Sequence, residues 1–519
     1  MSAVVPGPTS RPRVSPALAA ALTFLAAACV LVLEIAAARL LAPYVGVSLT
    51  TYTAIIGVIL AGIALGAWLG GRAADRTAPE RLVGPTFALG GLAAIAAVPV
   101  VGTLGEGLTG GGVGASLVLA TAGFVAPATI LSAVGPMLVR ATIRDLASSG
   151  RVVGRLSAIG TAGAITGTFL TGFVLLGAMP TRLIVVGTGG ILVVAGLLVA
   201  WWLRGSRAAI TTLLVAAVGS ITIAAAAPSP CERESAYYCI AVRAEPGDPT
   251  RRTLILDNLR HAFVDIDDPT AVTFAYVRWF AAATADLVAG ASGVAGATAA
   301  DLAPGASGVA GSRLDAVHLG GGGFAFPRYL RAVVADSRHI VLELDPVVLD
   351  VARRELGFVP DPAIDVRLGD ARGTLRGVPD DSADLVVGDA FGGLSVPWHL
   401  TTREFIAEID RVLRPDGRYV ANLIDGPELR LVRAEVATLL ERFDHIAVAT
   451  WRDALHGASG GNVVVVASHV PFDLAALRTR VVAGDPGATV IGGTDVAAFA
   501  SGAPVLRDDF APADQLLGR

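Results

Sequence analysis

The chain contains no lysine, so all 40 of its strongly basic side chains are arginines, and no arginine-rich run occurs. Its formal net charge is −4 at pH 7. Proteins that bind nucleic acid need a basic surface to neutralise phosphates, and we therefore expect no nucleic-acid partner. Only 16% of the 519 residues are charged, whereas 53% are hydrophobic. This balance is typical of a chain that joins a membrane part to a soluble part.

Cysteine is scarce, with Cys29, Cys231 and Cys239 as its three occurrences. No pair has the spacing of zinc ligands with a further cysteine or histidine nearby, so we expect no metal site. Cys231 and Cys239 flank the segment CERESAYYC. A disulfide between them would suit an oxidising compartment, and two unpaired thiols are the alternative.

The first half of the chain is a series of apolar segments long enough to cross a membrane, which takes about 20 residues. A polar, proline-rich tail over residues 1–16 precedes a predicted membrane domain over residues 17–226. We expect about seven helical spans, near residues 17–38, 52–71, 82–104, 116–139, 156–178, 183–203 and 208–226.

Arginines in alternate connections predict the orientation of these spans. Arg72, Arg76 and Arg81 separate the second span from the third, whereas the glycine-rich stretch 105–115 has no arginine. The pattern places the N-terminus in the cytoplasm of a multi-pass protein of the cell membrane. The side of the soluble half stays open, because seven spans place it outside and six or eight place it inside.

The second half begins with short alternating segments that predict a small β-unit over residues 230–270. Residues 271–288 then show helical periodicity. Residues 285–299 and 300–314 are near duplicates rich in glycine, alanine and serine, and they predict a flexible loop.

From residue 314 onward, apolar strands alternate with helices, which predicts a parallel, doubly wound sheet. We therefore expect an α/β Rossmann-type domain of the class I methyltransferase kind over residues 271–519. The predicted strands are 314–319, 339–344, 364–368, 384–389, 417–423, 445–450 and 462–468, with helices that include 346–356 and 402–412. The last two strands are close together in the chain, as in an antiparallel edge pair.

Candidate ligand-binding residues follow the carboxyl ends of the early strands, the edge at which open α/β sheets bind ligands. Gly320, Gly321 and Gly322 follow the first strand. Glycine lets the backbone approach a ligand, and the N-terminus of the next helix, expected near Phe324, offers free N–H groups.

Acidic residues follow the next three strands. The second strand ends in Glu343 and Asp345, whose carboxylates can accept hydrogen bonds from ribose hydroxyls. The third leads to Asp370 and Ala371, where an acid can accept a hydrogen bond from an adenine amino group, and the fourth ends at Asp389. Together they predict an adenosyl-binding edge, although such acids also often cap the following helix.

These motifs occur in the order found in spermidine synthases. They are ESAYY at 234–238, LILDN at 254–258, GGGG at 320–323, LELD at 342–345, GDA at 369–371, GDAF at 388–391 and LRDDFAPADQLL at 506–517. With the preceding spans, the chain resembles the fused transporter-like/spermidine-synthase-like membrane proteins of the polyamine aminopropyltransferase family. The resemblance implies a homodimer that transfers an aminopropyl group from decarboxylated S-adenosylmethionine to putrescine or a related amine.

By this resemblance Glu343 would hold the ribose, Asp370 would hold the adenine, and Asp389 would take a proton from the attacking amine. Such a base is needed because an alkyl amine, with a pKa of about 10, is protonated at neutral pH. Tyr237 and Tyr276 are candidates for the wall of the amine pocket, with a place in the core as the alternative. His399 would contact the substrate from a loop, where a hydrogen bond to the backbone is its alternative.

The chain also departs from the family pattern at the amine-binding edge. Gly323 or a neighbour stands where the family has an aspartate in its glycine loop, and Ala390 begins a stretch without the second aspartate and the proline of the family's Asp-Ser-x-Asp-Pro loop. After Tyr276, Val277 and Arg278 replace an expected acid. The alternatives are therefore methyl transfer from S-adenosylmethionine, or a non-catalytic sensor or transporter that binds a polyamine or a nucleoside.

Overall fold

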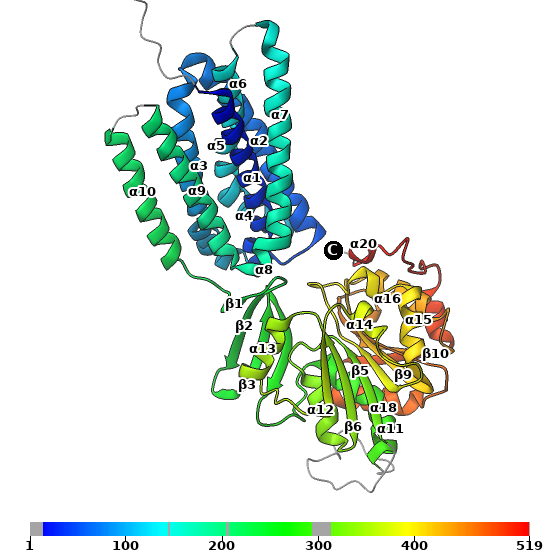
Figure 1. Cartoon of the computed structure of the whole chain (residues 1–519). Coiled ribbons are helices and arrows are strands. Elements are labelled where there is room, and N and C mark those ends of the chain that lie inside the picture. The colour runs from blue at the N-terminus through cyan, green and yellow to red at the C-terminus, as the bar shows by residue number, and fades with distance from the viewer. Residues whose placement is uncertain (1–13, 144–145, 204–206, 293–312, 518–519) are drawn as a thin grey trace, which may run out of the picture. The chain divides into compact units, whose positions relative to one another are not determined.

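A computed structural model describes residues 14–143, 146–203, 207–292 and 313–517. The chain divides into two compact units, Met1–Cys239 and Ile240–Arg519. The first unit consists mainly of long helices, and the second is built on a large β-sheet (Figure 1).

Helices occupy all seven predicted apolar segments of the first unit. Their bounds are α1 (Pro16–Val45), α2 (Leu49–Arg76), α3 (Pro79–Gly105), η1 (Glu106–Leu108), α4 (Gly112–Ala120), η2 (Thr121–Val125), α5 (Ala126–Ser132), α6 (Val134–Thr142), η3 (Leu146–Ser148), α7 (Ser149–Leu170), η4 (Thr171–Leu175), α8 (Leu176–Ala178), α9 (Thr181–Trp202) and α10 (Arg207–Ala226).

Six stretches among the described residues are long and apolar enough to cross a membrane, whereas about seven were predicted. The fourth runs from Gly112 to Thr142 through η2, and the fifth runs from Ser149 to Ala178 through η4. The seventh predicted span coincides with α10, whose apolar part, Thr211–Ala226, is shorter than the other six. The predicted all-α membrane domain is otherwise confirmed as a set of apolar helices.

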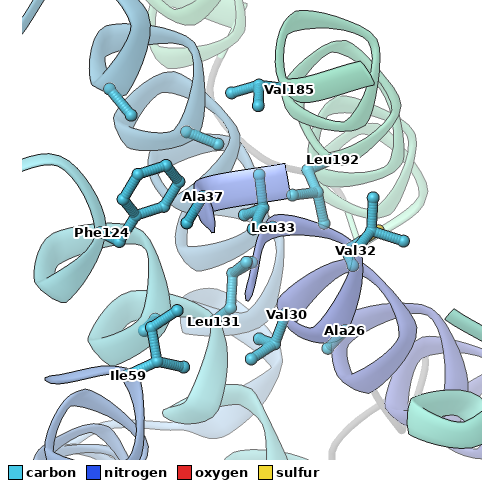
Figure 2. Packing of buried hydrophobic residues seen from close by; sticks show 14 of the residues in the cluster. Ala26, Val30, Val32, Leu33, Ala37, Ile59, Phe124, Leu131, Val185 and Leu192 are labelled. Carbon is cyan, nitrogen blue, oxygen red and sulfur yellow. The ribbon is translucent and has the colours of Figure 1, made fainter. Parts of the chain in front are cut away.

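Helix α1 supplies much of the buried core of this unit. Figure 2 shows Val30 and Leu33 of α1 among side chains from other helices, including Ile59 of α2, Leu131 of α5 and Leu192 of α9. These side chains are at most 5% exposed. An α1 that is buried in this way is consistent with a helix packed inside a bundle.

Glycines allow close contacts between helices of this unit. A Cβ added at Gly66 of α2 would lie 2.1 Å from the carbonyl oxygen of Thr129 in α5. A Cβ at Gly163 of α7 would lie 2.3 Å from the carbonyl oxygen of Phe24 in α1. These positions therefore need glycine because two backbones meet there.

The segment after the last helix is fixed by a disulfide and by helix-end contacts. Cys231 and Cys239 are bonded, with Cα atoms 5.1 Å apart. The Arg39 guanidinium of α1 donates to the carbonyl oxygens of Ser235, at 3.1 Å, and of Tyr237. The bridged alternative for the two cysteines is thus the one that the structure contains.

The predicted β-unit is present as short strands. β1 (Arg233–Glu234) belongs to the first unit, while β2 (Cys239–Glu245), β3 (Asp248–Leu256) and β4 (Leu259–Asp265) form antiparallel pairs β2–β3 and β3–β4. Helix α11 (Ala275–Ser292) follows. The predicted flexible loop over 285–314 is wrong at residues 285–292, which are helical, and its residues 293–312 lie outside the described part of the chain.

The large sheet has eight strands in the order β12-β10-β11-β9-β8-β5-β6-β7. Their bounds are β5 (Leu314–Leu319), β6 (Ser337–Glu343), β7 (Ile364–Leu368), β8 (Ala383–Gly388), β9 (Leu413–Asp425), β10 (His445–Trp451), β11 (Gly461–Ser468) and β12 (Ala488–Gly492). Strands β7, β6, β5, β8 and β9 are parallel, and β11 is antiparallel to both β9 and β10. This is the predicted Rossmann-type fold, and the strand order reverses between β5 and β8.

The late strands differ from the prediction in one respect. β10 and β11 pair in antiparallel fashion, as expected, but they do not form the edge of the sheet. β12, which was not predicted, pairs with β10 and covers it. β12 has five residues, and such a short apolar run carries little periodicity.

Helices cover both faces of this sheet with apolar side chains. One face packs against α11, α12 (Ala325–Val333) and α18 (Leu474–Gly484). The other packs against α14 (Ala371–Leu375), α15 (Arg403–Val412), α16 (Arg430–Leu439) and α19 (Thr494–Ala500). The remaining helices are α13 (Pro346–Glu355), η5 (Trp398–Leu400), α17 (Arg452–Leu455) and α20 (Ala513–Leu516).

Candidate active site

The glycine loop after β5 lies against the loop after β8. Leu319 of β5 is opposite Gly388 of β8, and the Asp389 N–H donates to the Leu319 carbonyl oxygen at 2.9 Å. Gly320 has a φ of +96°, and a Cβ at this position would lie 2.6 Å from the Asp389 carbonyl oxygen. A side chain at Gly320 would thus be strained and would also push the two loops apart.

Glu343, at the end of β6, is held by three backbone N–H groups. Its Oε2 accepts from Gly321 at 2.9 Å and from Gly322 at 3.0 Å, while Oε1 accepts from Asp345 at 2.8 Å. Burial raises the pKa of Glu343, and these three hydrogen bonds oppose the rise. The carboxylate therefore links the glycine loop to the start of α13.

Asp345 takes the capping role that the sequence left as its alternative. Its Oδ1 accepts from the Val347 N–H at 2.9 Å, it precedes α13, and it is 1% exposed. No open carboxylate edge is left at Asp345 for a ribose. Of Glu343 and Asp345, only Glu343 therefore remains a candidate for a contact with ribose.

Asp370 also caps a helix, but it remains open to solvent. One oxygen accepts from the Gly373 N–H at 3.1 Å, and the other lies 2.8 Å from His399 Nε2. Burial raises the pKa of Asp370, but the His399 and Gly373 hydrogen bonds lower it more, so it lies below its usual value. Its side chain is 48% exposed, and the buried Ala371 begins α14 behind it.

A cavity of about 390 Å³ opens beside the glycine loop. Gly320–Gly323 and Asp389 line one part of it, and aromatic side chains that include Tyr276, Phe280 and Trp451 line another. Glu343 and Asp370 do not line this cavity. The geometry thus separates the acids that follow β6 and β7 from an aromatic pocket, with the glycine loop between them.

Asp389 is the acid that faces the pocket. The Tyr276 hydroxyl donates to its Oδ2 at 3.2 Å, and Asn422 Nδ2 donates to its Oδ1 at 3.1 Å. Burial raises the pKa of Asp389 to about 6, and the two hydrogen bonds oppose that rise. A carboxylate with such a pKa can accept a proton near neutral pH.

The other predicted pocket residues are placed differently. His399 lies against Asp370 and is absent from the described cavity lining. Tyr237 is 42% exposed and belongs to the first unit, so its place in the pocket stays a prediction.

Several lining residues were missed from the sequence. Asn422 of β9 and Asn462 of β11 form a pair, with Asn462 Nδ2 donating to Asn422 Oδ1 at 3.0 Å. Because Asn422 also donates to Asp389, both asparagines belong to the site. A polar residue inside each of two apolar strands was the available signal, but only the sheet brings the two residues together.

The second unit is similar to transferases of two kinds. Residues 317–421 match the family model described as a methyltransferase domain. A polyamine aminopropyltransferase of Vibrio vulnificus is 35% identical over 113 residues, which is 21% of this chain and 38% of that protein. An eEF1A lysine and N-terminal methyltransferase of Danio rerio is 52% identical over 54 residues, which is 10% of this chain and 8% of that protein.

Among solved structures, a probable spermidine synthase from Corynebacterium glutamicum is 27% identical, with a TM-score of 0.48. The match covers 55% of this chain and 98% of that one. This chain spans less than two fifths of the length of each curated relative. With the strand order above, the matching family model identifies the fold around residues 317–421 as that of a methyltransferase domain.

We predict that Tyr276→Phe raises the pKa of Asp389 further, because the ionised carboxylate loses a donor. The pKa of Asp389 should rise by roughly 1 unit. The measurement is an NMR titration of the Asp389 carboxyl carbon in the purified full-length protein. Tyr329→Phe, at another buried tyrosine, is the matched control and should leave the pKa of Asp389 in place. An unchanged pKa of Asp389 in Tyr276→Phe would contradict the role of the Tyr276 hydroxyl as a donor to this carboxylate.

Proposed function

We propose that the second unit transfers an aminopropyl group from decarboxylated S-adenosylmethionine to an amine, putrescine or a related one. The observation that carries the proposal is the environment of Asp389, which lines the pocket beside the glycine loop. Its carboxylate has a raised pKa and accepts hydrogen bonds from Tyr276 and Asn422. In the reaction the amine nitrogen attacks the carbon bound to the sulfonium. The C–S bond breaks, methylthioadenosine leaves, and the amine proton passes to Asp389.

The co-substrate would occupy the edge formed by Glu343, Asp370 and the glycine loop. Glu343 is already held by the Gly321 and Gly322 N–H groups, so its position is set before a ribose arrives. Asp370 is half exposed at the next strand end, where an adenine amino group can donate to it. A preset edge of this kind lowers the cost of ordering the site on binding.

Methyl transfer from S-adenosylmethionine is the second candidate. It is favoured by the methyltransferase model, which spans Glu343, Asp370 and Asp389, and by Gly323, which offers no carboxylate to the ammonium group of an aminopropyl chain. The same base at Asp389 serves both reactions, so the leaving nucleoside distinguishes them. A sensor or a transporter would yield neither methylthioadenosine nor S-adenosylhomocysteine while still binding the nucleoside.

We predict that Asp389→Asn lowers the rate of product formation by about 10²- to 10⁴-fold, because the amine loses its proton acceptor. Purified full-length protein would be incubated with each co-substrate and putrescine, and methylthioadenosine and S-adenosylhomocysteine would be quantified by chromatography. Asp350→Asn, at an exposed acid of α13, is the control with full activity. A rate unaffected in Asp389→Asn would remove this residue from the mechanism.

The nucleoside edge makes a separate prediction. Glu343→Gln replaces a carboxylate that accepts three N–H groups with a neutral amide, so the glycine loop loses its anchor. The affinity for methylthioadenosine should fall by about 10- to 100-fold, as expected for hydrogen bonds to a charged group. Titration calorimetry measures it, with Asp350→Asn again as the control. Unchanged affinity would place the nucleoside elsewhere.

We further propose that the first unit anchors the chain in the cell membrane with its N-terminus in the cytoplasm and the second unit outside, in a homodimer. This location requires α10 to cross as well. The Cys231–Cys239 bond supports it, since disulfides persist in oxidising compartments. After reduction, a membrane-impermeant thiol reagent should label the partly exposed Cys231 in intact cells, with the buried Cys29 as the unlabelled control. Labelling that requires lysis would place this segment inside.

A further inference from the structure

A buried pair of histidines joins the aromatic pocket to the interior of the sheet. His318 of β5 lines the pocket and is 2% exposed, and His339 of the neighbouring β6 is 1% exposed. His318 Nε2 lies 3.0 Å from His339 Nδ1, and His339 Nε2 lies 2.9 Å from the Ser337 hydroxyl. His318 is opposite Val387 of β8, two residues before Asp389. The proposed base therefore directly follows the strand that pairs with the strand of this histidine.

The Ser337 hydroxyl sets the direction of each hydrogen bond in this chain of side chains. The Ser337 hydroxyl donates its single proton to the Val334 carbonyl oxygen at 2.8 Å, so it can only accept from His339. The proton of His339 is then on Nε2, and its Nδ1 must accept from His318 Nε2–H. His318 is left with an unprotonated Nδ1. Burial lowers the pKa of His339 to about 4 and that of His318 well below its usual value, so both rings are neutral.

The charge of the pocket limits what can bind there. Among the described residues that line it, Asp389 is the only acid, and Arg260 supplies the only arginine. One carboxylate balances one ammonium group, and a second ammonium would face a neutral imidazole in a largely aromatic wall. An uncharged donor, such as a hydroxyl, would suit a neutral acceptor nitrogen without the cost of burying another charge.

We propose that His318 Nδ1 recognises the far end of the acceptor, and that the acceptor is an amine with one positive charge and a second, neutral hydrogen-bond donor. The reacting ammonium lies at Asp389, and the distant hydroxyl or N–H donates to His318. Ser337 and His339 are positioning residues, which hold His318 in the accepting tautomer. This inference rests on the proposed transfer to an amine and narrows its substrate from diamines to amino alcohols and their like.

Three amines with the same carbon chain test the proposal on the unaltered protein. Aminobutanol carries one ammonium and a hydroxyl, butylamine carries one ammonium alone, and putrescine carries two. Calorimetry on the full chain saturated with methylthioadenosine should show that aminobutanol binds about 5- to 10-fold more tightly than butylamine and more tightly than putrescine. Equal affinities, tighter binding of putrescine, or no binding of any of the three would overturn the inference.

Two variants then locate the selectivity. His318→Phe keeps an aromatic ring but removes the acceptor, so the preference for aminobutanol over butylamine should vanish while butylamine affinity stays. Ser337→Ala removes the acceptor that keeps the proton of His339 on Nε2, so His318 is no longer held in its accepting tautomer. The preference for aminobutanol over butylamine should therefore decrease. His456→Phe, at an exposed histidine, is the control. An unchanged preference in a folded His318→Phe would overturn the assignment. Because binding is measured without turnover, failed product formation would count against the transfer reaction and leave this result standing.

Discussion

The site depends on the reversal of strand order between β5 and β8. At this point the connections leave the sheet in opposite directions, so the loops that follow the two strands face each other. The Asp389 N–H to Leu319 carbonyl hydrogen bond joins the two loops, and the absence of a side chain at Gly320 lets them meet. The glycine loop, Asp389 and the pocket all take their positions from this junction.

Around the junction, acids that look equivalent in the sequence have different environments. Glu343 is buried and accepts hydrogen bonds from three backbone N–H groups, whereas Asp345 caps the N-terminus of α13. Asp370 is half exposed with a lowered pKa, and Asp389 faces an aromatic pocket with a raised one. The four carboxylates have similar intrinsic pKa values, so burial and hydrogen bonding make the difference between them. The environments of Glu343 and Asp370 suit the binding of a ligand, and that of Asp389 suits the acceptance of a proton.

The fold could be predicted from the sequence because the strands of the sheet core are continuous apolar runs. The predicted strands 314–319 and 364–368 coincide with β5 and β7, since both are bounded by turn or helix-start residues. β12 was missed because five residues carry too little pattern. The beginning of the repeat was predicted to be a loop because glycine and alanine favour flexibility, whereas α11 continues through this segment and packs Leu287 and Val288 in the core beside the sheet.

The sequence by itself determined the apolar helices, the order of the strands along the chain, and which strand ends carry glycine or acid, because these follow from local periodicity and residue type. Only the tertiary structure decided that His399 contacts Asp370, that Asn422 and Tyr276 hold Asp389, and that His318 and His339 share a hydrogen bond. Each of these contacts joins residues at least 21 positions apart. The sheet brings them together through pairing between strands, and that pairing is a property of the whole domain.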